Sequence, residues 1–128
     1  MRKKKLINKK AINPYFSIIT VVKNDQKNIQ KTLKSIKSQT YLNFEYIIID
    51  GKSSDKTIDK INKFRRSINL LISEKDKGIY FAMNKGLKLC RGQVVLFLNS
   101  GDTLTRDALK IVRQKFKKEE IDFVFGTV

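Results

Sequence analysis

Apolar and polar positions follow two alternating patterns along the chain. Short runs that are apolar throughout are typical of buried strands, and most are followed by a stretch in which apolar residues recur three or four positions apart, as in an amphipathic helix. The predicted strands are Phe16–Val22, Phe44–Ile49, Ile68–Ile72, Val94–Leu98 and Phe123–Val128. The predicted helices between them present Ile29, Leu33 and Ile36; Ile58, Ile61 and Phe64; Ile79, Ala82, Met83, Leu87 and Cys90; and Ala108, Ile111, Val112 and Phe116. Because apolar-throughout strands are expected where helices cover both faces of a parallel sheet, the pattern predicts an α/β fold with a doubly wound, mostly parallel sheet.

The start of the chain differs from the rest. Residues 1–14 carry a basic cluster without any acid and are predicted to be a flexible arm, followed by a domain over residues 15–128. A signal peptide is a poor interpretation, because the apolar run after the arm contains Ser17 and Thr20 and lacks a small-residue cleavage site. No segment approaches the roughly 18 uninterrupted apolar residues of a membrane span. We therefore expect a cytoplasmic protein that at most rests on the inner face of the membrane.

The composition permits one folded domain and gives it a strong positive charge. The 128 residues include 41% hydrophobic residues, enough for a core, and 28 Lys plus Arg against 12 Asp plus Glu, a net charge of +16. Such a charge suggests a nucleic acid or an anionic membrane as partner. However, the excess is mostly Lys in a chain also rich in Ile and Asn, the bias that A/T-rich codons produce. Nucleic acid is therefore an unlikely partner, and a non-catalytic basic binding module remains the alternative interpretation.

Several kinds of chemistry are excluded by the residues present. With no His and one Cys, the chain cannot form a Ser-His-Asp triad, a Cys-His pair, a His metal site or an internal disulfide. No G-x-G-x-x-G follows the first predicted strand, and a P-loop ending at Gly51-Lys52-Ser53 would need its first Gly where Tyr46 stands. Cys90 is predicted to fill the core side of its helix. Carboxylates, amides, hydroxyls, lysines and the backbone remain available.

The acids gather at the ends of the predicted strands. Because parallel strands end at the same edge of a sheet, where open α/β folds bind ligands, the residues that follow them should lie together. The acids in question are Asp50, Glu74, Asp76 and Asp102, with Gly51, Gly78 and Gly101 beside them. The sequence therefore predicts a binding site at this edge.

Four segments carry a resemblance to a known family. They are Ser17–Asn24, Asp50–Thr57, Asp76–Gly86 and Phe97–Asp102. In this order and spacing they resemble the N-terminal, donor-binding half of a family 2 glycosyltransferase, a GT-A-type nucleotide-sugar enzyme. The resemblance spans nearly the whole chain after the arm and implies a Rossmann-like GT-A fold that stops after its fifth strand.

The resemblance also implies an activity. Such an enzyme transfers a sugar from a nucleotide-diphosphate sugar to a saccharide or lipid-linked acceptor, as in cell-surface polysaccharide synthesis. Its catalytic base lies further along the family's chain, so no base is nominated here and this chain would hold the donor-binding half. A contact of the basic arm with an anionic membrane is compatible with this function.

Individual site residues follow from the same resemblance. The implied nucleotide-sugar-binding residues are Thr20, Val22, Asn24, Asp50, Ser53, Asp76, Lys77, Gly78, Asn84, Asn99 and Ser100. Among them, Asp50 would recognise the base or ribose. Asp102 stands in the family's D-x-D-type metal motif and is the implied ligand of Mg²⁺ or Mn²⁺, which would neutralise the diphosphate leaving group.

The chain departs from the family pattern at several positions. Asn99 and Gly101 stand where many relatives carry acids in the metal motif, and Phe81 occupies a position that is often acidic. Lys52 and Lys56 replace common glycines. Asp102 is therefore the one certain anionic metal ligand that the resemblance implies.

Overall fold

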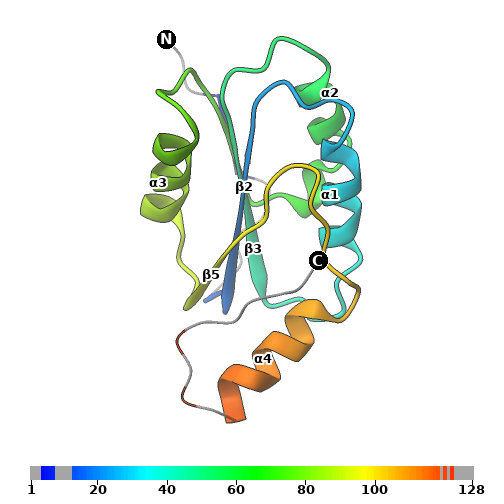
Figure 1. Ribbon diagram of the computed structural model, residues 1–128, viewed down its shortest axis with the longest axis vertical. Helices are drawn as coiled ribbons and strands as arrows, with labels where there is room; N and C mark the ends of the chain where they lie inside the picture. The colour runs from blue at the N-terminus through cyan, green and yellow to red at the C-terminus, as the bar shows by residue number, and fades with distance from the viewer. Residues whose placement is uncertain (1–3, 8–12, 119, 121, 123–128) are drawn as a thin grey trace.

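A twisted sheet with helices on both faces organises the chain (Figure 1). The computed structural model describes residues 4–7, 13–118, 120 and 122. The elements are β1 (Lys4–Ile7), β2 (Phe16–Val22), α1 (Ile29–Lys37), β3 (Phe44–Asp50), α2 (Thr57–Asn62), the 3-10 turn η1 (Arg65–Ser67), β4 (Leu70–Ser73), α3 (Ile79–Leu89), β5 (Val94–Phe97) and α4 (Ala108–Lys118). Within these residues five strands form one sheet in the order β1-β4-β3-β2-β5, in which β2 to β5 are parallel. The predicted α/β fold with a mostly parallel sheet is confirmed.

The first strand corrects the prediction of a flexible arm. Lys4–Ile7 forms β1, which pairs antiparallel with β4 so that Lys4 lies opposite Ser73. The hydrophobic pattern missed this strand because its first half is lysine, a residue that often occupies the edge strand of a sheet. The predicted strand at Phe123–Val128 lies outside the described residues.

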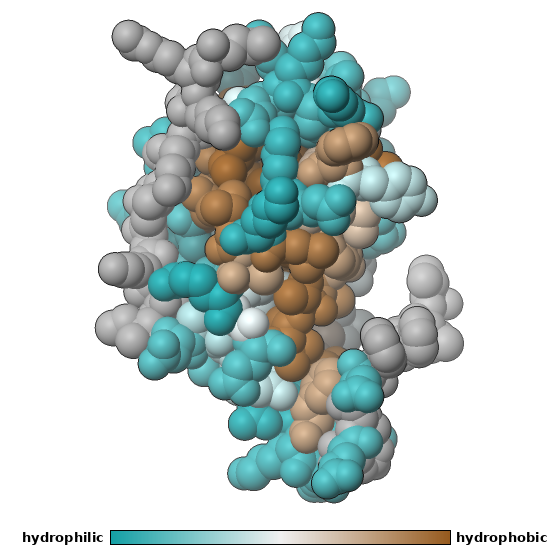
Figure 2. Space-filling view, turned by 90° about the vertical axis from the view of Figure 1, so that its left-hand side faces the viewer, coloured by the Kyte–Doolittle hydropathy of each residue, from teal (hydrophilic) through white to brown (hydrophobic). Residues whose placement is uncertain are grey.

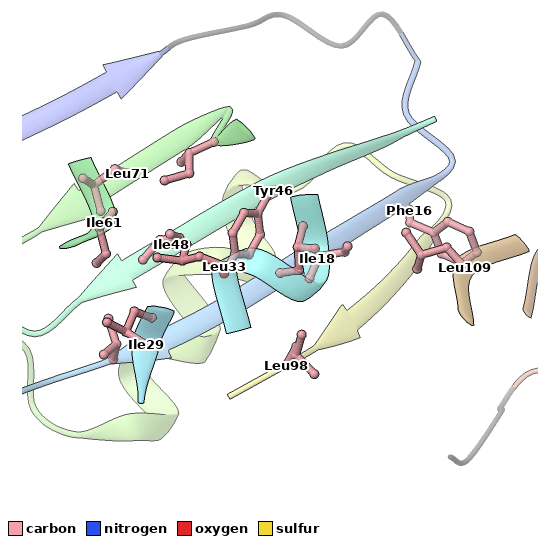
Figure 3. Packing of buried hydrophobic residues seen from close by; sticks show 13 residues of the cluster. Phe16, Ile18, Ile29, Leu33, Tyr46, Ile48, Ile61, Leu71, Leu98 and Leu109 are labelled. Atoms are coloured by element: carbon pink, nitrogen blue, oxygen red, sulfur yellow. The ribbon is translucent and has the colours of Figure 1, made fainter. Parts of the chain in front are cut away.

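The larger core lies between the sheet and the helices α1 and α2, which cover one of its faces (Figure 3). Alternate residues of β2 point into it, including Phe16, Ile18 and Val22. The helix α1 contributes the predicted positions Ile29 and Leu33, both no more than 2% exposed. Period-two strands and a period-3.6 helix therefore bury the faces that their sequences predict.

The other face of the sheet packs against α3 through small residues. Ala82 and Gly86 are the buried residues of α3, and a Cβ on Gly86 would come within 2.6 Å of the Ile19 side chain, so the helix lies close to β2. The predicted inward positions Ile79 and Leu87 are instead 50% and 41% exposed. That part of the prediction is wrong, because close approach requires the smallest residues of the helix to face the sheet. Figure 2 faces this side and shows apolar atoms at its surface.

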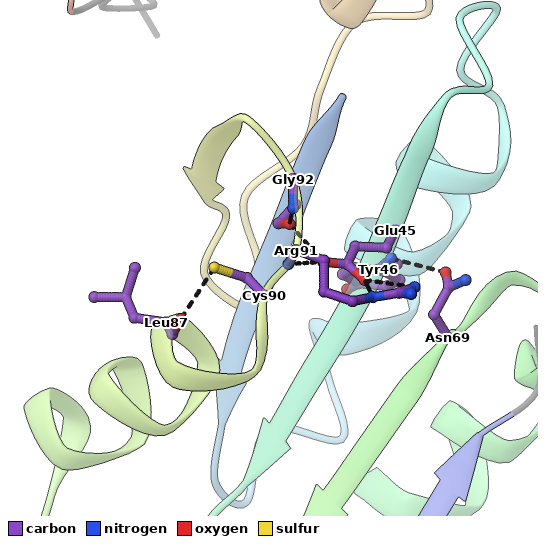
Figure 4. A network of polar contacts seen from close by, with 8 residues as sticks. Glu45, Tyr46, Asn69, Leu87, Cys90, Arg91 and Gly92 are labelled. Carbon is purple, nitrogen blue, oxygen red and sulfur yellow. Dashed lines mark hydrogen bonds and ion pairs between the residues drawn. The ribbon is translucent and has the colours of Figure 1, made fainter. Parts of the chain in front are cut away.

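Two further apolar positions differ from the prediction. In α4, Leu109 is buried and Val112 packs against the larger core, whereas Ile111 is 52% exposed. Cys90 lies directly after α3 rather than within it, where it is half-buried and its thiol donates to the Leu87 carbonyl at 3.0 Å (Figure 4). The buried face of α4 is therefore rotated relative to the predicted one. The helix α3 ends at Leu89, before it reaches Cys90.

A buried carboxylate lies near the amino end of β3 and organises a network of polar contacts (Figure 4). Glu45 is 3% exposed, and its Oε1 accepts hydrogen bonds from the Ser17 hydroxyl and the Arg91 N–H, both at 2.6 Å. The Arg91 side chain pairs with Oε2, with Nε and Oε2 3.4 Å apart. The Gly92 N–H donates to the Ser17 hydroxyl at 2.8 Å. This network joins the segment before β5 to β2 and β3.

Among the described helices, none combines the length and the apolar content that crossing a bilayer requires.

Candidate functional site

The carboxyl ends of β2 to β5 gather four loops at one edge of the sheet, as their parallel arrangement requires. The loop after β2 contains Asn24, whose φ of 49° is left-handed. Its N–H donates to the Ser53 hydroxyl at 2.8 Å, and its side-chain oxygen accepts from the Ser54 N–H at 2.7 Å. Asn24 and Ser53, two predicted site residues, are thus brought together. Their contacts join the loops that follow β2 and β3.

A second set of contacts strengthens the same junction. The Asp25 N–H donates to the Thr57 hydroxyl at 2.9 Å, and that hydroxyl donates to the Asp55 carboxylate at 2.5 Å. The hydrogen bond from Thr57 is the largest of the causes that lower the pKa of the half-buried Asp55 carboxyl, and backbone N–H groups, including that of Gln26, add to it. The two loops therefore form one hydrogen-bonded wall of the site.

Asp50 lies at the end of β3 and is fully buried. Its Oδ2 accepts from the Ser53 N–H at 3.0 Å and from the Ser73 hydroxyl at 2.6 Å, and its Oδ1 accepts from the Ser53 hydroxyl at 2.5 Å. In this arrangement the carboxylate joins the ends of β3 and β4. Recognition of a base or ribose by Asp50 stays a prediction, and direct contact would require Ser53 or Ser73 to move away.

Two predicted site residues have side chains in the core. Thr20 is fully buried, accepts a hydrogen bond from the Tyr46 hydroxyl at 2.8 Å and donates to the Leu98 carbonyl at 2.7 Å. Burial raises the pKa of the Tyr46 hydroxyl well above its ordinary value, so it stays protonated as a donor. Val22 is 3% exposed and packs in the larger core. Both side chains therefore lie in the interior of the domain. Nucleotide binding by Thr20 and Val22 stays a prediction, which would involve their backbone rather than their side chains.

The loop after β4 presents polar groups beside α3. The Asp76 Oδ1 accepts from the Gly78 N–H at 3.2 Å, and Gly78, with φ of 122°, adopts a conformation that favours glycine. Asp76 Oδ2 is buried and has no hydrogen-bond partner among the described residues. Lys77 and Asn84, both predicted for the site, are exposed. This loop therefore has a carboxylate oxygen without a protein partner and an exposed cation, and the adjoining α3 adds the exposed Asn84 amide.

Glu74 belongs to this loop but is already paired. Its carboxylate lies 2.9 Å from the Lys85 ammonium. Of the four acids expected to converge at this edge, Glu74 is therefore held in an ion pair with α3.

The loop after β5 carries the predicted metal ligand. Asn99 and Asp102 are exposed, and the Ser100 hydroxyl donates to the Asp25 carboxylate at 2.7 Å. Gly101 has φ of 98°, which a residue with a side chain would adopt only with strain. Asp25 is not among the predicted site residues, although it lies in the loop that follows a predicted strand, which is the signal that could have found it. Ser100 and Asp25 tie this loop to the loop after β2.

The oxygen donors of this edge fit a metal shared with a ligand. Within the described residues no group of three or more acids or cysteines could hold an ion by protein alone. Asp102 offers an exposed carboxylate, and Mg²⁺ is commonly bound by one or two carboxylates together with phosphate oxygens and water. The residues present therefore suit a divalent ion that binds jointly with a diphosphate.

Comparison with known proteins identifies the family. The family model described as glycosyl transferase family 2 matches residues 17–128. The chain belongs to glycosyl transferase family 2. The matched range includes all four loops at the carboxyl edge of the sheet, so the site described above lies within the part of the chain that matches the family.

Relatives within family 2 are similar over most of this chain. A PGL/p-HBAD biosynthesis glycosyltransferase of Mycobacterium bovis is 36% identical over 120 residues, 90% of this chain and 47% of the relative. An Escherichia coli relative, UDP-Glc:alpha-D-GlcNAc-diphosphoundecaprenol beta-1,3-glucosyltransferase WfgD, is 35% identical over 86% of this chain and 44% of its own length. The chain thus spans about half the length of these curated relatives.

A solved transferase structure shares the fold. Staphylococcus aureus TarS in complex with UDP-GlcNAc superposes with a TM-score of 0.75 at 28% identity, over 82% of this chain and 32% of that chain. The GT-A-type fold that the sequence motifs imply is confirmed.

Proposed function

We propose that this chain provides the donor-binding half of a glycosyltransferase that uses a nucleotide-diphosphate sugar and a saccharide or lipid-linked acceptor. The observation that carries the proposal is the placement of the Asp76 and Asp102 loops at the carboxyl edge of the parallel strands, where α/β folds bind ligands. Support for the donor comes from TarS, which is seen with UDP-GlcNAc. Support for a lipid-linked acceptor comes from the name of the E. coli relative.

The residues of this chain would act by binding and orienting the donor. Asp102 would hold a Mg²⁺ or Mn²⁺ ion, which supplies charge neutralisation at the diphosphate when bound. The unpartnered Oδ2 of Asp76 is suited to accept a hydrogen bond from a ribose or sugar hydroxyl. Exposed Lys77 can approach the phosphates, while Asn99 offers a neutral donor beside Asp102. The base that deprotonates the acceptor is not assigned to any described residue.

Titration calorimetry with UDP, with and without Mn²⁺, tests this proposal. We expect UDP binding that Mn²⁺ strengthens, and an Asp102→Asn variant that loses most of this metal-dependent gain. Asp59→Asn, the same change at an exposed position on α2, should bind as wild type does. Absence of binding to UDP and to other nucleoside diphosphates, in the presence of Mn²⁺, would contradict the proposal.

A further inference from the structure

One side chain of α1 binds the backbone of the loop that carries Asp102. Thr32 is fully buried, and its hydroxyl makes two hydrogen bonds to the loop backbone. It accepts from the Gly101 N–H at 2.8 Å and donates to the Asp102 carbonyl at 2.7 Å. A single hydroxyl thus satisfies a donor and an acceptor on consecutive residues, and holds the backbone on both sides of the bond between Gly101 and the candidate metal ligand Asp102.

Thr32 is the first of three polar residues, in α1 and directly beyond its end, that contact the same segment. The Ser35 hydroxyl accepts from the Leu104 N–H at 3.2 Å. The Gln39 amide donates to the Thr105 carbonyl at 2.7 Å. Thr32 and Ser35 are three positions apart and lie on one face of α1, and Gln39 follows shortly after the helix ends at Lys37. Residues 101–105 are therefore attached to α1 and to the segment that follows it.

The other side of the loop is also constrained. The Leu98 carbonyl accepts from the buried Thr20 hydroxyl, and Ser100 donates to Asp25. Directly after Ser100, Gly101 adopts its left-handed conformation, and the Asp102 side chain that follows is exposed. The position of the Asp102 carboxylate thus depends on the backbone that Thr32 holds.

We propose that Thr32 is a positioning residue for the metal-dependent binding of the nucleotide diphosphate. This inference rests on the proposed function, because Asp102 is the metal ligand only if the donor is a nucleotide diphosphate. Loss of the hydroxyl leaves a partly buried N–H and carbonyl without partners, so the loop shifts to reach water. A shifted Asp102 carboxylate no longer meets the ion and the diphosphate together.

The test compares three variants by calorimetry with UDP in the presence and absence of Mn²⁺. Thr32→Val keeps the shape of the side chain and removes the hydroxyl, and we expect it to reduce the Mn²⁺-dependent gain in UDP affinity about tenfold while metal-free affinity stays unchanged. Thr32→Ser keeps the hydroxyl and should retain the gain. Ser17→Ala removes another fully buried, doubly bonded hydroxyl at the opposite edge of the sheet and should also retain it.

A second measurement reports the loop without any ligand. Amide hydrogen exchange at Gly101 should be faster in Thr32→Val and unchanged in Ser17→Ala. If Thr32→Val does not fold, Thr32→Ala removes the same hydroxyl and should give the same two results.

An unchanged Mn²⁺-dependent gain in Thr32→Val would overturn the inference, and so would an equal loss in Ser17→Ala, since either would show that the hydroxyl has no specific role. In both cases wild-type binding of UDP would remain. Absence of UDP binding by the wild type would instead refute the proposed function and, with it, the role of Thr32.

Discussion

The two ends of β3 each bury a carboxylate, but they treat its charge differently. At the amino end, Glu45 pairs with the Arg91 guanidinium as well as with hydroxyl and N–H donors. At the carboxyl end, Asp50 is held by Ser53 and Ser73 alone, and the described residues show no ion pair to it. Hydroxyl donors stabilise an anion without neutralising it.

This difference separates a structural end of the sheet from a functional one. At the amino end, the Glu45 carboxylate is paired with Arg91 of the same chain. Together with the hydrogen bond from Gly92 to Ser17, this pair joins β2, β3 and the start of β5. The opposite end combines Asp50, the unpartnered oxygen of Asp76 and exposed Asp102. Polar groups that have no hydrogen-bond or ion-pair partner within the protein are the ones that can pair with a ligand.

The largest expected effect comes from adding a methyl group at each end. In Gly92→Ala the new Cβ would meet the Ser17 backbone nitrogen and Oγ at 2.6 Å, so we expect a loss of about 3 kcal/mol in the free energy of unfolding. In Gly51→Ala the nearest atoms belong to the flexible Lys23 side chain, at 3.3 Å, and the loss should stay below about 1 kcal/mol. Urea denaturation measures both. Equal losses would show that the amino end is no more tightly packed than the carboxyl end.

Neutralising each carboxylate sharpens the comparison further. Glu45→Gln removes the ion pair with Arg91 and should cost about 2 kcal/mol of stability with no change in UDP affinity. Asp50→Asn disturbs Ser53 and the loop junction with Asn24, so we expect UDP affinity to fall about tenfold for a smaller cost in stability. Denaturation and calorimetry on the same samples separate the two quantities. The comparison fails if Glu45→Gln weakens UDP binding as much as Asp50→Asn does.

A smaller effect should come from relieving strain at the carboxyl end. Lys52 has φ of 58°, a left-handed conformation that costs a residue with a side chain about 1 kcal/mol. Lys52→Gly should therefore raise the midpoint of thermal unfolding by roughly 4 °C. Lys56→Gly, at a neighbouring position whose φ of −82° is ordinary, should lower it. A lower midpoint for Lys52→Gly would indicate that its side-chain contacts outweigh the strain.

The smallest effect concerns the titration of Asp55 at the loop junction. The hydrogen bond from Thr57 lowers the pKa of the Asp55 carboxyl, so its stabilising contribution is present above the ordinary carboxyl pKa and is lost as pH falls through the lowered pKa. Thr57→Val should raise the pKa of Asp55 toward its ordinary value of about 3.9 and flatten the acid side of the stability curve. A carboxyl NMR titration measures the shift.

Much of the fold was predictable because its elements bury regular patterns. Strands such as Val94–Phe97 are apolar throughout, and α1 presents Ile29, Leu33 and Ile36 at helical spacing. Edge strand β1 was not predictable, since half of it is lysine and its pairing with β4 depends on a partner distant in sequence. The orientation of α3 was also hidden, because Gly86 faces the sheet only by virtue of its contact with Ile19.

The site was predictable as a location but only in part as a set of contacts. Motif order placed Asp50, Asp76 and Asp102 at strand ends, where the structure has them. Sequence could not show that Thr20 points into the core, because strand alternation depends on which face each helix covers. Thr32 gave no signal, since a threonine within a helix resembles any other until the loop above it is known.

The attachment of α1 to the loop after β5 has a consequence for how such domains diverge. Thr32, Ser35 and Gln39 contact the loop only through its backbone. Gly101 is constrained by its left-handed φ, Ser100 by its bond to Asp25 and Leu104 by its packing on the larger core, but the exposed side chains of that loop can change without altering its path. A domain built this way can carry an amide or a carboxylate beside Asp102, as Asn99 illustrates, and its ligand preference can change by point substitution while the loop keeps the same geometry.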